Sequence, residues 1–134
     1  MKFMLLIYND PTMLDAMPAT QFDSDMRHCL SNADELRHAG KLLDSQMLES
    51  HTTARSLRSR NGKLTAVDGP FSETKEVLGG FNLIEADSME EAERIAASFP
   101  WIRSGCVEIR PVRDIEVVRR RVNVGGGRRA ASDG

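Results

Sequence analysis

The chain has 134 residues, the length of one ordinary domain that can bury a single hydrophobic core without disulfides. Hydrophobic residues make up 40% and charged residues 28% of the chain, as in soluble globular proteins, and no apolar run approaches the roughly 18 residues of a membrane-spanning helix. The net charge of -2 hides an asymmetry, because residues 1–112 carry 12 basic and 17 acidic side chains while residues 113–134 carry 6 and 3. We therefore expect an acidic body with a basic end and no membrane segment.

The chain opens with the run Met-Lys-Phe-Met-Leu-Leu-Ile-Tyr, which has no small-residue cleavage site after it. Residues 2–8 are therefore predicted to form a first strand, covered on at least one face, and not a signal peptide. Cys29 and Cys106 have no CxxC spacing, so a reducing compartment suits them, and we expect both thiols to be buried. The predicted location is cytoplasmic.

An amphipathic helix is predicted over residues 21–39, with Thr20 or Asp23 as its N-cap and Gly40 just after its end. A second strand is predicted over residues 41–48. The apolar positions of the helix recur at steps of three and four, which places them on one stripe; they are Phe22, Met26, Cys29, Leu30, Ala33 and Leu36.

A β-hairpin is predicted over residues 52–60 and 63–68, because the dipeptide Asn61-Gly62 between them tolerates positive φ at both central positions of a type I′ turn. This turn type also sets the pairing of the two strands. The predicted pairs are Arg60 with Lys63, Ser59 with Leu64 and Leu57 with Ala66.

Two more strands and a second helix complete the predicted elements. Residues 81–85 are predicted to form a strand, and residues 106–112 a closing strand near a sheet edge. Between them, Ser88 and Glu91 have the spacing of a capping box, and the helix that follows ends at Pro100.

The order of strands and helices predicts an α+β fold: a ferredoxin-like split βαβ sheet with two helices on one face and an inserted β-hairpin. The other face of the sheet needs a cover that no third predicted helix supplies. A second copy of the chain is the simplest cover, so we predict a homodimer packed sheet to sheet.

A thirteen-residue connection is predicted from Asp68 to Gly80, long enough to suggest a function of its own. Asp68 is interpreted as a turn residue or, alternatively, as a pocket carboxylate. Lys75 beside a carboxylate either forms an ion pair or binds an anionic ligand. The glycine pair lacks a phosphate-binding context and suggests close approach of a neighbouring backbone. The candidate ligand-binding or loop residues are Asp68, Gly69, Pro70, Phe71, Glu73, Lys75, Glu76, Gly79 and Gly80.

Three segments together resemble the DGPF (DGPFAETKE) proteins of the YCII-related family: the opening M-L-L-I-Y, the block D-G-P-F-S-E-T-K-E-V-L-G-G-F and the closing V-E-I-R-P-V. The resemblance covers residues 1–114 and departs at Ser72, where the family often has alanine. Residues 115–134 are predicted as a basic, largely disordered tail. Its arginines, including Arg128 and Arg129, could contact phosphates, but we do not expect nucleic-acid binding.

The resemblance implies a dimeric α/β-barrel type of fold and mostly bacterial proteins, whose genes often lie beside extracytoplasmic-function sigma factors. Some relatives are thought to be enzymes that use a histidine and an aspartate, and one is a dehydrochlorinase of a chlorinated hydroxyquinol. His28 lies close to the position of the family's histidine, although Cys29 is one residue nearer. His28 and Asp68 are the candidate catalytic residues.

Two functions remain open from the sequence. The first is a small-molecule-binding or regulatory dimer linked to sigma-factor signalling, and the alternative is a lyase or hydrolase-like enzyme with general acid/base catalysis in a pocket beside the loop. The three histidines are too dispersed in sequence to indicate a metal site, and no cofactor motif occurs. We predict neither a metal nor a cofactor.

Overall fold

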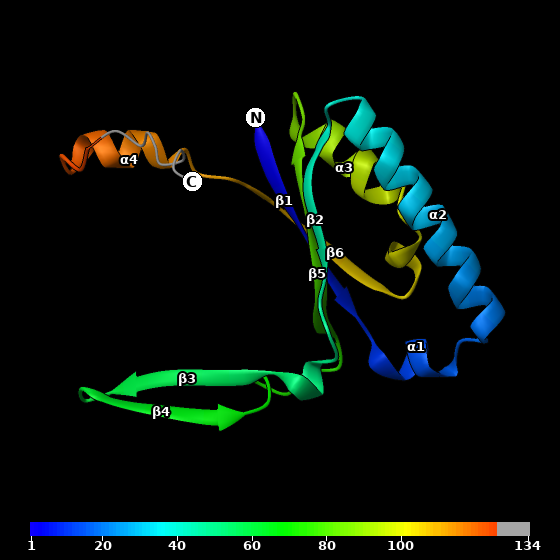
Figure 1. Ribbon diagram of the computed structural model, residues 1–134, viewed down its shortest axis with the longest axis horizontal. Helices are drawn as coiled ribbons and strands as arrows, with labels where there is room; N and C mark the ends of the chain where they lie inside the picture. Colours follow the sequence, from blue (N-terminus) through cyan, green and yellow to red (C-terminus); the bar gives the residue numbers. More distant parts are fainter. Residues whose placement is uncertain (126–134) are drawn as a thin grey trace.

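The computed structural model describes residues 1–125 of the chain. One antiparallel four-stranded sheet forms its centre, in the order β2-β5-β1-β6. Its strands are β1 (Lys2–Asn9), β2 (Leu42–Met47), β5 (Val77–Glu85) and β6 (Gly105–Pro111). Helices α2 (Ala19–His38) and α3 (Met89–Ala97) lie together over one face of this sheet (Figure 1). The predicted α+β class is confirmed.

Strand β1 lies inside the sheet, with β5 and β6 on its two sides. Side chains alternate between the faces of a strand, and here Phe3 and Leu5 point to the helices with only 1% of their surface exposed. Met4 and Leu6 point to the opposite face, where they are half-buried. We call this second face the open face. The core on the helix side consists of Phe3, Leu5, Ala33, Leu42, Ile84, Ala86, Ala92, Ile95, Ala96 and Phe99.

Helix α2 confirms the predicted amphipathic helix, but it begins after Pro18 and not at Thr20 or Asp23. Gly40, just past its end, has the predicted left-handed conformation with φ of 76°. A short helix not predicted from the sequence, α1 (Pro11–Ala16), precedes it. The carboxylate of Asp10 caps α1 by accepting a hydrogen bond from the Thr12 amide at 2.9 Å.

The predicted hairpin is present as β3 (Arg55–Arg60) and β4 (Lys63–Asp68), and the predicted pairing is confirmed throughout. Asn61 and Gly62 both have positive φ, of 52° and 76°. The start of the predicted first strand is instead a 3-10 helix, η1 (His51–Thr53), which Ser50 caps. The hairpin pairs with no other strand of residues 1–125, and all of its strand residues except Ser56 are exposed.

The predicted thirteen-residue connection is wrong in length, because β5 already begins at Val77. Gly79 and Gly80 therefore lie inside a strand and not in a loop. The predicted close approach of backbone is confirmed at Gly80, where a Cβ atom would lie 2.7 Å from the Gln46 carbonyl oxygen of the neighbouring strand. Glycine pairs suggest turns from sequence alone, whereas these two allow strands to approach closely.

Helix α3 begins as the capping box predicts, with the Ser88 hydroxyl accepting a hydrogen bond from the Glu91 amide at 3.1 Å. The Glu91 carboxylate accepts from the backbone amide of Asp87 at 2.6 Å and pairs with the Lys41 ammonium at 2.7 Å. This pair connects the start of α3 to the residue before β2. After α3, a 3-10 helix, η2 (Pro100–Arg103), buries Trp101.

A fourth helix, α4 (Ile115–Arg121), forms where the sequence predicts the start of a disordered tail. Asp114 caps this helix by accepting a hydrogen bond from the Glu116 amide. Arg128 and Arg129, which could contact phosphates but are not expected to bind nucleic acid, lie outside the described residues. None of the helices in residues 1–125 is both long and apolar enough to cross a lipid bilayer.

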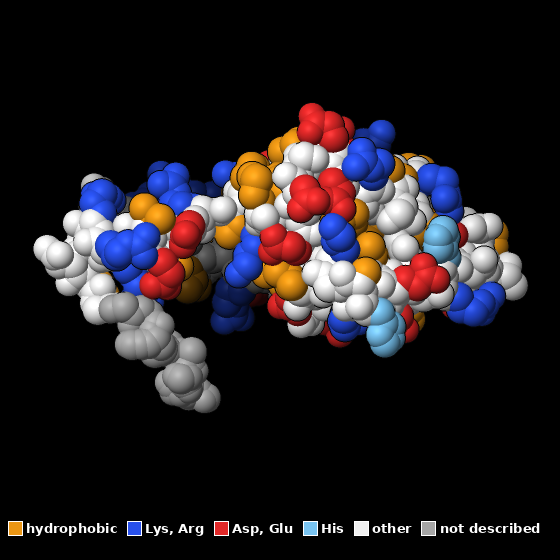
Figure 2. Space-filling model, turned by 90° about the horizontal axis from the view of Figure 1, so that it is seen from above, with side chains coloured by type: hydrophobic (Ala, Val, Ile, Leu, Met, Phe, Trp, Pro, Cys, Tyr) orange, Lys and Arg blue, Asp and Glu red, His pale blue; other side chains and the backbone are white. Residues whose placement is uncertain are grey.

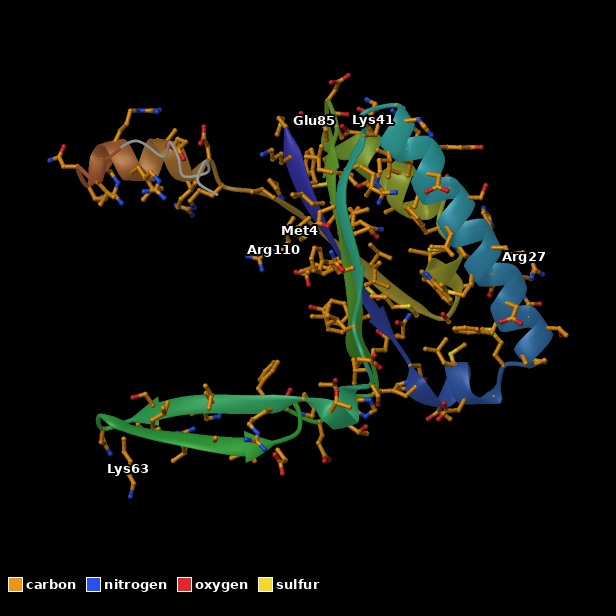
Figure 3. All side chains as sticks on the ribbon, in the orientation of Figure 1. Met4, Arg27, Lys41, Lys63, Glu85 and Arg110 are labelled. Atoms are coloured by element: carbon orange, nitrogen blue, oxygen red, sulfur yellow. The ribbon has the colours of Figure 1, made fainter. Side chains whose placement is uncertain are left out.

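The hairpin and α4 both project from the open-face side of the sheet, away from α2 and α3 (Figure 1). Met4 and Arg110, which pair across β1 and β6, lie on this same side (Figure 3). Cys106 also lies on the outward side of β6 and is exposed, whereas Cys29 is half-buried. The expectation of two buried thiols is therefore wrong for Cys106, because its strand position faces away from the helices.

The core accounts for a first prediction. Ile84→Ala removes a fully buried side chain (0% exposed) and should lower the free energy of unfolding by about 2 to 5 kcal/mol. The same substitution at Ile102, which is 41% exposed, should cost less than about 1 kcal/mol. Urea unfolding of both variants measures the difference, and equal losses would show that Ile84 is not a core residue.

The Glu91 carboxylate leads to a second prediction. The Asp87 amide and then Lys41 hold the pKa of Glu91 below its ordinary value in the folded protein. A depressed folded pKa stabilises the fold above the unfolded pKa of about 4.3, and this stability is lost as the pH falls through the folded pKa. The melting temperature of Glu91→Gln should therefore lie below wild type at pH 7, with a smaller gap near pH 3. A gap that stays constant or grows toward acid pH would contradict this role.

Candidate functional site

A cavity of about 270 Å³ lies between the helix-side face of the sheet and helices α1 and α2. Strands β1, β2 and β5 supply its floor, while α1, α2 and η2 supply its walls. The lining residues are Ile7, Asn9, Leu14, Phe22, Met26, Cys29, Leu30, Ser45, Gln46, Met47, Gly79, Gly80, Asn82 and Trp101. We call it the helix-side cavity.

The floor carries a buried amide, Asn82, which is only 4% exposed. The Ser45 hydroxyl of β2 donates a hydrogen bond to the Asn82 side-chain oxygen at 2.6 Å. Within residues 1–125 the Asn82 amide nitrogen donates no hydrogen bond, so it keeps its capacity for a bound molecule. Asn82 occupies an inward-facing position of an otherwise apolar strand.

A second amide, Asn9, lies at the end of β1. Its side-chain nitrogen is buried and has no hydrogen-bond partner among the described residues. Its side-chain oxygen lies so close to Gly79 that a Cβ atom there would be 2.3 Å from it, so a side chain at this position would require the Asn9 amide to move. A buried donor without an acceptor is costly, and this one belongs to a residue that lines the cavity.

The walls are apolar and partly aromatic. The rings of Phe22 and Trp101 lie 5.9 Å apart between centroids, tilted by 44°. Cys29 lines the same wall of α2, and burial raises the pKa of its thiol. At the pH of a cell the thiol is therefore neutral and behaves as a small apolar group.

A buried carboxylate, Asp25, ties α2 to η2 and so positions Trp101. Asp25 accepts hydrogen bonds from the Gln21 amide at 2.9 Å and from the Arg103 guanidinium at 3.1 Å. Sequence reasoning missed this residue. Its position three residues after Phe22, close to the buried stripe of the helix, is the signal that could have found it.

The structure does not bring the two candidate catalytic residues together. His28 lies on the exposed side of α2 and lines none of the cavities. Arg27 beside it points away from the sheet (Figure 3). Asp68 lies at the base of the hairpin, exposed, and pairs with Arg55 across the two strands at 3.1 Å.

The candidate loop residues divide between the two faces of the sheet. Gly79 and Gly80 line the helix-side cavity. Pro70, Phe71 and Glu76 line a second cavity of about 570 Å³ at the base of the hairpin. The remaining loop candidates lie outside both of these cavities: Gly69, whose φ is 103°, and the exposed Glu73 and Lys75.

Lys75 makes no ion pair within 4 Å among the described residues. The predicted pairing of this lysine with a neighbouring carboxylate is therefore not seen. Residues 1–125 also contain no group of three His, Cys, Asp or Glu side chains arranged to hold a metal ion. The polar groups available to a ligand in the helix-side cavity are amides and a hydroxyl.

Sequence reasoning also missed Asn9, Asn82 and Trp101 as site residues. An asparagine inside an apolar strand is the one available signal for Asn82, because buried polar side chains need a partner. No pattern in the sequence pointed to Asn9, which follows the apolar run of β1 and is easily interpreted as part of a turn.

Comparison with known proteins adds the family. An uncharacterized protein of Rhizobium meliloti (strain 1021) is 34% identical over 114 residues, which are 84% of this chain and 92% of that protein. A solved structure, 5-chloro-2-hydroxyhydroquinone dehydrochlorinase from Burkholderia phenoliruptrix AC1100 in complex with 2,5-dihydroxybenzoquinone, is 16% identical, with a TM-score of 0.49 over 84% of this chain and 94% of that chain. Residues 1–116 match the YCII-related domain, and the chain belongs to this family.

Proposed function

We propose that this protein is a small-molecule-binding module whose ligand is an uncharged, partly apolar ring compound with hydroxyl or carbonyl groups. The observation that carries the proposal is the helix-side cavity, in which the buried amides Asn9 and Asn82 face apolar walls. Binding sites for small molecules commonly combine an apolar lining with a few polar groups that fix orientation.

The lack of charge in the cavity defines the ligand further. No Asp, Glu, His, Lys or Arg is among the residues that line it. A carboxylate or ammonium group would lose its hydration there without gaining an opposite charge, which is costly. The amides and the Ser45 hydroxyl instead match neutral oxygen groups, and Phe22 and Trp101 match a flat ring.

The same observation favours binding over catalysis. General acid/base chemistry needs a titratable group within hydrogen-bond reach of the substrate. Cys29 is the one titratable side chain of the lining, and its raised pKa keeps it protonated. The alternative, a lyase or hydrolase-like enzyme using His28 and Asp68, stays a prediction that requires both residues to reach a bound molecule.

We further propose that the module is a homodimer packed through the open faces of two sheets, in the ferredoxin-like, dimeric barrel arrangement. The open face of β1 and β5 carries four apolar side chains: Met4, Leu6, Phe81 and Leu83. No described element covers them. Two such faces would bury each other at the usual sheet spacing of about 10 Å.

The finer family assignment remains part of the proposal. The D-G-P-F block supports membership of the DGPF branch, and the resemblance behind it implies a bacterial, cytoplasmic protein with a regulatory link to an extracytoplasmic-function sigma factor. A ligand-binding dimer suits such a regulatory role because ligand and partner would use different surfaces.

The ligand chemistry leads to a third prediction, with 4-hydroxybenzamide and 4-hydroxybenzoate as a matched pair of probes. The neutral amide should raise the melting temperature and quench Trp101, the single tryptophan of the chain, at concentrations where the carboxylate does neither. Asn82→Leu should weaken binding of the amide probe about tenfold, because it removes the hydrogen-bonding amide of Asn82 while leaving a side chain of similar volume. Differential scanning fluorimetry and fluorescence titration measure both effects.

Lys75→Ala is the control, because Lys75 is exposed and lines neither cavity. This variant should bind the amide as wild type does. Stronger binding of the carboxylate, or loss of binding in Lys75→Ala with Asn82→Leu unaffected, would move the site to the loop and overturn the proposal.

A further inference from the structure

Two segments at opposite ends of the open face have apolar surface that nothing in residues 1–125 covers. The hairpin leaves the sheet where β1 ends, and α4 leaves it where β1 begins (Figure 1). A two-stranded hairpin is marginally stable alone, and a helix of two turns is less stable still. Each of these segments therefore needs a surface to pack against.

The cavity at the base of the hairpin is one such surface, and we call it the hairpin-base groove. Leu48, Leu78 and Phe71 form much of its wall, and Phe71 is 77% exposed. Glu49 and Glu76 are its acidic lining residues, and no lysine or arginine is part of the lining. Arg58 stands beside the groove, where its guanidinium donates a hydrogen bond to the Phe71 carbonyl oxygen at 3.2 Å. The groove is thus apolar with an acidic border, and Tyr8 and Leu78 connect it to the open face.

Helix α4 has the complementary pattern. At about 100° per residue, Ile115, Val118 and Val122 fall within one narrow sector of the helix. Arg119 and Arg121 flank this apolar stripe on its two sides, while Arg120 lies on the opposite side. Arginine side chains stand beside hydrophobic ones at the end of the molecule where α4 lies (Figure 2).

The groove of its own chain is out of reach for α4. The Val112 amide still bonds the Lys2 carbonyl oxygen, so the chain leaves the sheet at the end far from the groove. From there to Tyr8 is about 20 Å along β1, at about 3.4 Å per residue. The linker of two residues spans about 7 Å and α4 is about 10 Å long, which together fall short of the groove.

We propose that α4 of one copy lies in the hairpin-base groove of a second copy, with the apolar stripe against Phe71 and Leu78 and the arginines toward Glu49 and Glu76. The proposal rests on the sheet-to-sheet dimer proposed above. In such a dimer the two-fold axis lies between the two open faces, parallel to the sheets and perpendicular to the strands. Rotation about this axis exchanges the two ends of the open face. It carries α4 of each copy to the hairpin end of the other.

The total charge of the chain agrees with this exchange. Residues 113–125 carry four arginines and two acidic residues, whereas residues 1–112 carry 12 basic and 17 acidic side chains. Opposite charges at the border of an interface favour association and suppress other registers. The two-fold exchange thus places the basic helix beside Glu49 and Glu76 of the other copy, twice in each dimer.

Sedimentation equilibrium of the full-length chain tests the proposal through the dimer dissociation constant. Val118→Asp should raise this constant about 30-fold or more, because it places a charge in the apolar contact. Arg121→Glu should raise it about tenfold. Arg120→Glu makes the same change of charge on the opposite side of α4, and it should change the constant less than about threefold.

A charge exchange identifies the contact itself. Glu76→Lys should weaken the dimer as Arg121→Glu does, and the double variant Arg121→Glu/Glu76→Lys should return to within about threefold of wild type, because the two charges meet again across the interface. Circular dichroism of each variant confirms that the fold is retained.

The outcomes separate this inference from the proposals on which it rests. A dimeric wild type whose dissociation constant is unchanged by Val118→Asp and Arg121→Glu would overturn the α4 contact and leave the sheet-to-sheet dimer standing. A wild type that is monomeric at about 100 μM would overturn both. Ligand binding, read from Trp101 in the helix-side cavity, should be the same in all of these variants.

Discussion

The structure depends on one constraint, which is that strand β1 is apolar on both of its faces while helices cover only one. Phe3 and Leu5 form the centre of the core under α2 and α3, where they are almost completely buried. Met4 and Leu6 alternate with them and remain half-buried on the open face. Burying apolar surface is the main favourable term in folding, so a sheet of this kind is completed only by a second layer. The division of the molecule into a helix-covered side with a cavity and an open face, which we propose to be the dimer interface, follows from this single strand.

The helix-side cavity owes its shape to an irregularity in the strand pairing. The register between β1 and β5 shifts between Ile7 and Tyr8, because β5 has one residue more than β1 at this point. Such a bulge redirects side chains and is common beside functional sites. Here it brings Gly79 and Gly80 together at the floor of the cavity and places the Asn9 amide over Gly79. Asn9, whose side-chain nitrogen is buried without a partner among the described residues, thus lies at the same irregularity of the sheet.

The open-face side differs, since the hairpin and α4 that project from it are exposed, charged and weakly held within one chain. The hairpin carries Arg58, Arg60 and Lys63 along one of its faces, and the tip with Lys63 lies far from the sheet (Figure 3). Segments with so little burial are the least stable parts of a domain, and they commonly gain their order from a partner. Because this surface and the helix-side cavity lie on opposite faces of the sheet, the proposed ligand binding and the proposed assembly should respond to different mutations.

The sequence by itself determined the elements whose signals are local. The turn at Asn61 and Gly62 specified the hairpin and its register, and the spacing of apolar residues specified α2, because both depend only on residues close in the chain. It did not predict α4, whose seven residues are too few for a clear period, and it interpreted Gly79 and Gly80 as part of a loop. Only the tertiary structure decided the candidate site. More than 70 residues separate Asn9 from Asn82, and 19 separate Asn82 from Trp101. The sheet pairing and the packing of η2 bring all three to one cavity. A site of this kind leaves no short motif, since its chemistry comes from neutral groups that gain significance only when they are buried together.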